Sequence, residues 1–216
     1  MRKSFQISVT NKTLNLKPHI KSYCRITNKK IICDGEVFLA KNESETTEEF
    51  FKKIYQKLGI SYPKFHKMDL LCKAGFLASE LIAQTESIFE TNTALVFANK
   101  SSSWVSDEKH AQSIYSKESS ASPAVFVYTL PNIVLGEISI RHQLLSENLF
   151  LIFEAFSPDI FTEYANQILT ENKAEKVLAG WVELTENEMD VLVFLIDSHG
   201  DLELNKENVT NLYLKK

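Results

Sequence analysis

Arginine is scarce in this chain. Only Arg2, Arg25 and Arg141 occur among its 24 basic residues, and the formal net charge is −4. Nucleic-acid binding needs clustered positive charge to neutralise phosphates, and arginine binds phosphate in a bidentate manner that lysine cannot match. A mildly acidic chain whose positive charge is almost all lysine therefore argues against nucleic acid as an obligate partner.

Cysteine is equally scarce. Cys24, Cys33 and Cys72 are the three cysteines, and no CxxC pair occurs. An odd, low count of this kind indicates a reducing compartment and not a disulfide-stabilised scaffold. No thiol is present anywhere after Cys72.

The chain also lacks a long apolar run. Its first residues, MRKSFQISVTNKTLNL, alternate with polar residues and have no continuous apolar core of the signal-peptide type. No segment approaches the ~20 apolar residues that span a bilayer. We therefore expect a cytoplasmic protein with no membrane partner.

Motifs for metals and nucleotides are missing as well. The six glycines are too scattered to form a phosphate-binding loop, and the sequence has no HExxH, EF-hand or Cys/His zinc spacing. We expect no metal and no cofactor.

What the chain does contain is typical of a globular domain. Apolar residues make up 44% and charged residues 24% of its 216 positions. A chain of this length buries roughly 70% of its unfolded surface, which is enough for a substantial core. We therefore interpret residues 1–216 as a single domain.

Apolar periodicity switches between strand and helix along this domain. Short apolar or alternating runs predict strands at FQISVT, at a YCRIT/IICDG hairpin, at TALVFAN, and at residues 149–153, 176–184 and 189–196. Spacings of three and four residues predict helices at 48–57, 68–82, 107–116, 133–142 and 157–171. Gly136 would allow close packing of the fourth helix, and Ser157 followed by Pro158 is a typical start of the fifth. The alternation indicates an α/β fold with a mixed β-sheet and layered helices.

Residues 122–183 carry a recognisable pattern. Thr129-Leu130-Pro131-Asn132 is followed by Gly136, by Glu147-Asn148 and by Ala179-Gly180. This pattern resembles the middle of β-ketoacyl-(acyl carrier protein) synthases, which read T-[LV]-P-N, A-G, G-P-N, a strand, T-A-C-A-S-G and A-G-G. The resemblance implies half of a thiolase-like fold, in which two such halves are duplicated within one chain.

The position of the family's nucleophile is degenerate. Without a gap between Asn148 and Ala179, the nucleophilic cysteine falls on Ala155, flanked by Glu154 and Phe156. A methyl group cannot attack a thioester. Trp181 replaces the second glycine of A-G-G and would fill space beside this elbow. The family's catalytic histidine pair lies in its second half, and that pattern is matched by none of His19, His66, His110, His142 and His199.

The resemblance therefore implies a partner subunit. Chain-length factors of polyketide systems lack the nucleophile and pair with a catalytic ketosynthase, and this chain is similar to a short version from aryl-polyene or flexirubin-type pathways. The strand before the elbow would pair with its mate across the dimer axis; its residues are Leu149, Phe150, Leu151, Ile152 and Phe153. The segment before T-L-P-N would face the partner's acyl tunnel; its residues are Phe126, Val127, Tyr128 and Thr129. An acyl carrier protein would bind only indirectly, through the full-length ketosynthase.

Two alternatives remain open at this point. Glu154 could act as the base of a stand-alone acyl-thioester decarboxylase or hydrolase, although a solvated carboxylate at a helix start is the simpler interpretation. The chain could also be a homodimeric acyl-binding protein.

Other suggestive residues have plainer explanations. Cys72 lies in an apolar helical repeat and is better explained as a core residue than as a partner of His66. His142 suits a helix C-terminus as a cation. The run from Asp197 to Asp201 looks like a turn, because it lacks the partners of a nucleophile–base–orienter set.

Overall fold

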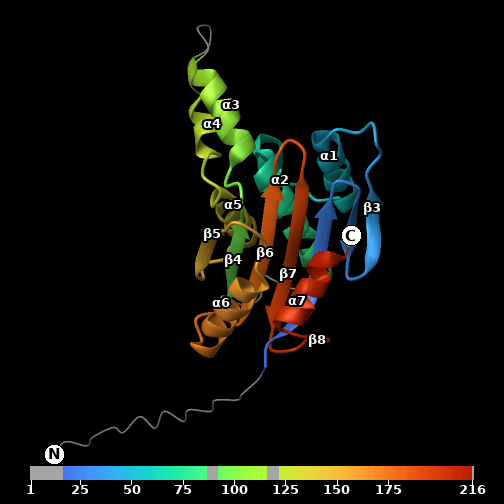
Figure 1. The fold of residues 1–216 in the computed structure, drawn as a ribbon, viewed down its shortest axis with the longest axis vertical. Coiled ribbons are helices and arrows are strands. Elements are labelled where there is room, and N and C mark those ends of the chain that lie inside the picture. The colour runs from blue at the N-terminus through green and yellow to red at the C-terminus, as the bar shows by residue number, and fades with distance from the viewer. Residues whose placement is uncertain (1–16, 87–91, 116–121, 216) are drawn as a thin grey trace, which may run out of the picture.

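A mixed sheet runs through the middle of the molecule (Figure 1). The computed structural model describes residues 17–86, 92–115 and 122–215. The strand order is β3-β2-β1-β7-β6-β4-β5, with β8 pairing beside β1. Pairs β4–β5 and β4–β6 are parallel and the other pairs are antiparallel. The expected α/β fold with a mixed sheet is confirmed.

The elements follow each other in the order the apolar patterns suggest. The strands are β1 His19–Thr27, β2 Lys30–Cys33, β3 Glu36–Ala40, β4 Thr93–Asn99, β5 Asn148–Ile152, β6 Lys176–Leu184, β7 Met189–Asp197 and β8 Leu202–Glu203. The helices are α1 Thr47–Leu58, α2 Leu70–Thr85, α3 Trp104–Tyr115, α4 Pro123–Val127, α5 Ile133–His142, α6 Pro158–Thr170 and α7 Lys206–Leu214, with a 3₁₀ turn at Pro63–Lys67. The strand predicted at FQISVT lies outside the described residues.

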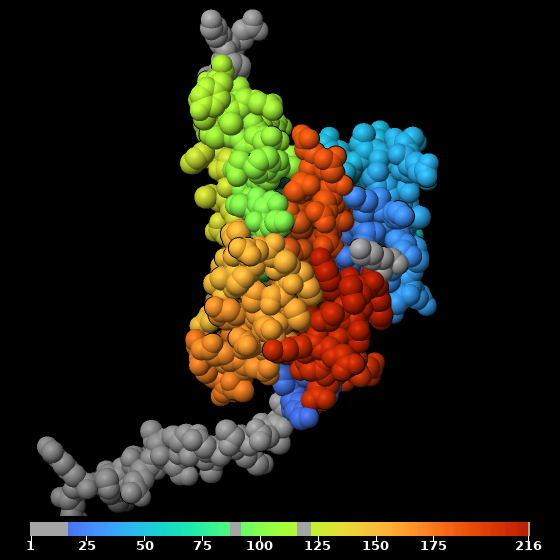
Figure 2. All heavy atoms as spheres, in the orientation of Figure 1, coloured from blue at the N-terminus to red at the C-terminus, as the bar shows by residue number. Residues whose placement is uncertain are grey.

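Helices cover both faces of the sheet and make two cores. On one face α1, α2 and α5 bury side chains such as Phe50, Phe76 and Ile138. On the other face α6 and α7 bury Phe161 and Val209. Every residue of β4 and β6 is buried, as expected of strands covered on both sides. Figure 2 shows α6 and α7, in orange and red, over the lower part of one face, and Figure 1 shows α3 and α4 projecting beyond the sheet as an arm.

Two local predictions need correction. A Cβ on Gly136 would meet no atom within 4 Å, so this glycine does not permit close packing. Gly75 does: a Cβ there would lie 2.6 Å from the side chain of Val134, so its absence lets α2 and α5 approach. Ser157 precedes α6 as expected, but its side chain makes no capping hydrogen bond, and Pro158 at the first helical position sets the helix start.

The N-terminal hairpin continues into a third strand that the sequence interpretation missed. Asp34 and Gly35 have φ values of 48° and 91° and form a two-residue turn between β2 and β3. An Asp-Gly pair suits such a turn because both central residues need positive φ. The strand β3 is therefore one edge of the sheet, and β5 is the other.

None of the helices within the described ranges is long and apolar enough to cross a membrane.

Candidate functional site

The elbow is the connection between β5 and α6, at residues 153–157. It lies where the parallel strands β4, β5 and β6 end, the edge at which open α/β sheets place their ligand sites. The backbone N–H of Phe153 donates to the carbonyl of Asn99 at 2.9 Å, which ties the elbow to the end of β4. Glu154 and Ala155 are both exposed.

The elbow contains no thiol. The cysteines lie on β1, β2 and α2, and Cys72 is buried with its pKa raised by burial, as expected for a core residue. Within the described ranges Glu154 makes no hydrogen bond or ion pair, and no histidine lies in the elbow. Residues 153–157 therefore contain neither a thiol nor a histidine that could activate one.

Phe156 closes the elbow from the sheet side. Its ring stacks on Tyr213 of α7, with centroids 3.8 Å apart and planes 4° apart. It also meets the edge of Trp181 at 5.9 Å and the ring of Phe161 at 5.8 Å. Trp181 does fill space beside the elbow, as expected. The sequence did not reveal that α7 would contribute the main contact.

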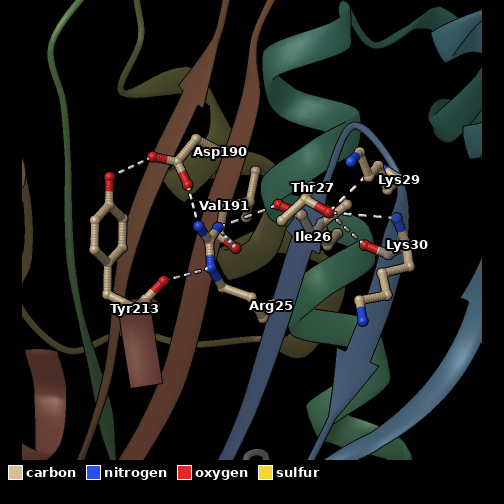
Figure 3. Close-up of polar contacts among 8 residues, drawn as sticks. All are labelled: Arg25, Ile26, Thr27, Lys29, Lys30, Asp190, Val191 and Tyr213. Atoms are coloured by element: carbon tan, nitrogen blue, oxygen red, sulfur yellow. Dashed lines mark hydrogen bonds and ion pairs between the residues drawn. The ribbon is translucent and has the colours of Figure 1, made fainter. Parts of the chain in front are cut away.

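A buried arginine holds α7 in this position (Figure 3). Arg25 of β1 is 1% exposed and forms an ion pair with Asp190 of β7. Its Nε donates to the carbonyl of Tyr213 at 3.0 Å, and one terminal nitrogen donates to the carbonyl of Val191 at 2.9 Å. The Tyr213 hydroxyl donates to Asp190. Burial, then the hydrogen bond to this carboxylate, raises the pKa of Tyr213, so it stays neutral and keeps donating.

The turn after β4 forms the second wall of the site. Buried Glu183 accepts the backbone N–H groups of Lys100 at 2.7 Å and of Ser101 at 3.0 Å. An open pocket of about 590 Å³ lies between this turn and the elbow, lined by Lys100, Ile152, Phe153 and Glu154. It presents one positive and one negative side chain beside apolar surface. Among the described residues no group of three potential metal ligands occurs.

The four residues predicted at an acyl tunnel do not share one environment. Phe126 and Val127 on α4 are 55% and 45% exposed. Tyr128 is partly buried against the α2/α5 core, and burial together with the charge of Glu137 raises its pKa to about 12. The carbonyl of Thr129 accepts a hydrogen bond from Ser103. Phe126 and Val127 are thus the exposed apolar side chains of the four, while the hydroxyl of half-buried Thr129 donates to the carbonyl of Phe126.

The strand predicted at Leu149 to Phe153 is confirmed as β5, one residue earlier, and among the described strands its partner is β4. The carbonyl of Glu147 accepts from the N–H of Leu95, and the N–H of Phe153 donates to the carbonyl of Asn99. The backbone groups of the odd-numbered residues from 147 to 153 therefore face β4. Because strand residues alternate, Asn148, Phe150 and Ile152 direct their N–H and C=O groups away from the sheet. Ile152 is 51% exposed. Pairing with a partner strand stays a prediction.

Two other clusters do not form catalytic sites. Ser198 donates to Asp197 at 3.0 Å and contacts the Nδ1 of His199 at 2.7 Å. The carboxylate accepts its hydrogen bond from the hydroxyl, and the imidazole Nδ1 lies farther away, at 3.9 Å. In a triad the carboxylate hydrogen-bonds the imidazole instead. His142 lies in the last turn of α5, as the sequence suggests, and its side chain is buried with its Nε2 2.9 Å from Glu80. Burial would raise the pKa of Glu80, but hydrogen bonds from His142 and Arg141 outweigh it and lower that pKa.

Comparison with known proteins places this fold. No protein-family model and no curated protein matches the chain. The ishigamide ketosynthase/chain length factor structure matches with a TM-score of 0.56 and 16% identity, over 84% of this chain and 62% of that one. The ketosynthase ApeO in complex with its chain length factor ApeC, from Xenorhabdus doucetiae, matches with a TM-score of 0.56 and 10% identity, over 91% of this chain and 90% of that one.

A third structure belongs to the same group. AntDE:AntF, a type II acyl-carrier protein in complex with its ketosynthase, matches with a TM-score of 0.54 and 14% identity, over 90% of this chain and 64% of that one. The chain thus spans less than two thirds of the first of these structures and nearly all of the ApeO/ApeC chain. The fold is that of ketosynthase/chain-length-factor structures, which confirms the predicted thiolase-like resemblance at the level of fold.

Proposed function

We propose that this chain is a non-catalytic, chain-length-factor-type subunit that pairs with a full-length β-ketoacyl synthase in fatty acid or polyketide-type (polyene) biosynthesis. The observation that carries the proposal is the elbow: a ketosynthase-like fold presents Ala155 at the strand-to-helix turn and closes that turn with Phe156. A subunit without a nucleophile contributes shape and contacts to a reaction that its partner performs.

The free edge of β5 supports pairing as the mode of assembly. Unpaired N–H and C=O groups on an edge strand are a template for another strand, and monomeric proteins usually cover such edges. The outward groups of Asn148, Phe150 and Ile152 are available for this purpose. In the pair, the partner strand would extend the sheet beyond β5.

The acyl contacts are assigned to α4. Phe126 and Val127 present exposed apolar side chains there and would line the partner's acyl tunnel, while the packing of Tyr128 on the core and the bond from Ser103 to the Thr129 carbonyl hold the segment in place. The acyl chain would arrive on an acyl carrier protein bound by the ketosynthase. We assign both proteins to the cytoplasm, where such carriers work.

Co-expression with the ketosynthases encoded nearby tests this function. Purification of the complex by size exclusion with light scattering should give a one-to-one heterodimer. Within that complex, Phe126→Ala and Val127→Ala should change the length of the acyl products, whereas Val37→Ala, equally exposed on β3, should not. A stable homodimer with no affinity for any of these ketosynthases would contradict the proposal.

The enzymatic alternative has its own measurement. Glu154→Gln should abolish any decarboxylation or hydrolysis of malonyl and acyl thioesters by the isolated chain if Glu154 is the base. If the subunit function is correct, the isolated chain has no such activity and the variant leaves product output of the heterodimer unchanged.

A further inference from the structure

Two cysteines face each other across the hairpin of β1 and β2. Cys24 and Cys33 are nine residues apart and are direct partners in the strand register. Their sulfur atoms lie 3.6 Å apart. The sequence suggested no pairing, because the two positions share no CxxC spacing; the hairpin turn brings them together.

The register at this point suits a disulfide. The backbone N–H of Asp34 donates to the carbonyl of Tyr23, so the neighbouring pair is the hydrogen-bonded one. Cys24 and Cys33 therefore occupy a non-hydrogen-bonded pair, in which the Cα atoms are about 4.5 Å apart. That separation lies within the range that disulfides span, and bond formation needs the sulfur atoms to approach to about 2.05 Å by side-chain rotation.

The two thiols differ in access. Cys33 is partly exposed, whereas Cys24 is fully buried in the core beneath α1 and α2. An oxidant in solution therefore reaches Cys33 first. Cys24 lies beside it as the resolving thiol, shielded from direct attack.

We propose that Cys24 and Cys33 form a peroxide-sensitive dithiol that closes to a cross-strand disulfide. Hydroperoxide oxidises Cys33 to a sulfenic acid and is itself reduced to the alcohol, or to water in the case of hydrogen peroxide. The Cys24 sulfur then attacks the sulfenic sulfur, the S–S bond forms, and water leaves with the sulfenic oxygen and the thiol proton. Two thiols are thus oxidised by one peroxide.

The pair is independent of the proposed function. In the sheet order, the strands β1, β7, β6 and β4 separate β2 from the β5 edge. Closure should therefore leave pairing with a ketosynthase unchanged. Because it cross-links the unfolded chain over a short loop, it should raise the Tm by about 5 °C.

The rate of closure should depend on pH. Burial, and then the neighbouring Cys33, raises the pKa of the Cys24 thiol well above its ordinary value. The thiolate is the attacking species, so the second step should accelerate as the solution is raised from about pH 7 to about pH 9.

Mass spectrometry of the full chain tests the inference. The protein is treated with hydrogen peroxide, unfolded in N-ethylmaleimide and weighed; wild type should carry one adduct in place of three, and dithiothreitol should restore three. Cys72→Ser should carry none after peroxide and two after reduction. Cys33→Ser, a conservative change at a partly exposed position, should carry two under both conditions.

The linkage can be read directly, because trypsin cleaves after Arg25, Lys29 and Lys30 and separates the two cysteines. A peptide pair joined through Cys24 and Cys33 is expected. Three adducts after peroxide, sulfinic acid at Cys33 without a linked peptide, or loss of both thiols in Cys33→Ser would each overturn the proposal.

Discussion

The two edges of the sheet are built differently. At the β3 edge, Lys57 of α1 donates to the carbonyl of Phe38 at 2.5 Å, and its ammonium group lies 4.3 Å from the Phe38 ring centroid. Phe38 is also the residue at which the register between β2 and β3 shifts, and a bulge together with a lysine at the edge hinders the addition of another strand. At the β5 edge, the described residues provide no such cap for Asn148, Phe150 and Ile152. Within the part of the chain that the structure describes, the β3 edge is protected and the β5 edge is open.

The open edge also has apolar surroundings. Ile140 and Leu145 on the segment before β5 are 58% and 96% exposed, and Ile152 is 51% exposed. The arm adds Trp104, Phe126 and Val127 with exposed side chains. Apolar surface beside an unpaired strand is a liability in a monomer and is typical of a surface that another protein covers. The comparison therefore supports β5, and not β3, as the assembly edge.

A charge on the open edge should weaken binding to the ketosynthase more than any other substitution considered. Ile152→Lys would bury an unpaired ammonium in the paired sheet, and we expect a loss of affinity for the ketosynthase of about 100-fold. Val37→Lys is the matched control, since Val37 is 57% exposed on β3. Titration of the two variants by calorimetry compares the edges. Equal losses of affinity in the two variants would show that the β3 and β5 edges do not differ in their role in binding.

Truncation of Phe156 should destabilise the elbow that follows the open-edge strand β5. Phe156→Ala removes the stack on Tyr213 and the contact with Trp181. For a half-buried aromatic residue we expect a loss of about 2–3 kcal/mol in the free energy of unfolding, measured by urea denaturation. Phe156→Leu should retain most of that stability. If Phe156→Ala unfolds at the wild-type urea concentration, α7 does not support the elbow.

The stability that the protein gains from the contact between α2 and α5 should depend on pH. Glu80 on α2 binds Arg141 and His142 of α5, and its pKa is lowered relative to the unfolded chain. Because the pKa of Glu80 is lowered on folding, the stability that its ion pairs contribute is complete above about pH 4.3 and is lost as the pH falls below that value. Glu80→Gln should cost about 1–2 kcal/mol at neutral pH and less in acid. An equal cost at both pH values would argue against this ion pair as the source.

The smallest effect is expected where the family has its nucleophile. Ala155→Cys restores a thiol, but no histidine lies in the elbow to activate it. The isolated variant should form no acyl-enzyme with an acyl thioester, as judged by mass spectrometry, and its affinity for the ketosynthase should equal that of wild type. Rapid acylation would show that the elbow retains catalytic geometry.

Local patterns in the sequence predicted most of the fold, and contacts between distant segments account for what they missed. The periodicity of residues 68–82 identified α2, and the apolar run TALVFAN identified β4, because both signals lie within one element. The contact of Phe156 with Tyr213 and that of Arg25 with Asp190 join residues far apart in the chain. No pattern within either segment encodes such a pairing.

In the candidate site, too, local patterns predict some features and contacts between distant segments decide the others. Ala155 and the strand before it follow from a motif, and the structure places them at the expected turn. The resemblance predicts one environment for Phe126 and Tyr128, because both lie in the segment at the T-L-P-N motif. The helix α4 and the turn after it place one outward and the other against the core, which only the packing of α2 and α5 decides.

Hydrogen exchange of the co-expressed complex measures whether β5 is the assembly edge. The outward amides of Asn148, Phe150 and Ile152 should exchange at least about 10-fold more slowly in the complex than in the free chain, while amides of β3 are unchanged. Protection confined to β3 or to another surface, with the β5 amides exchanging as in the free chain, would contradict assembly through β5.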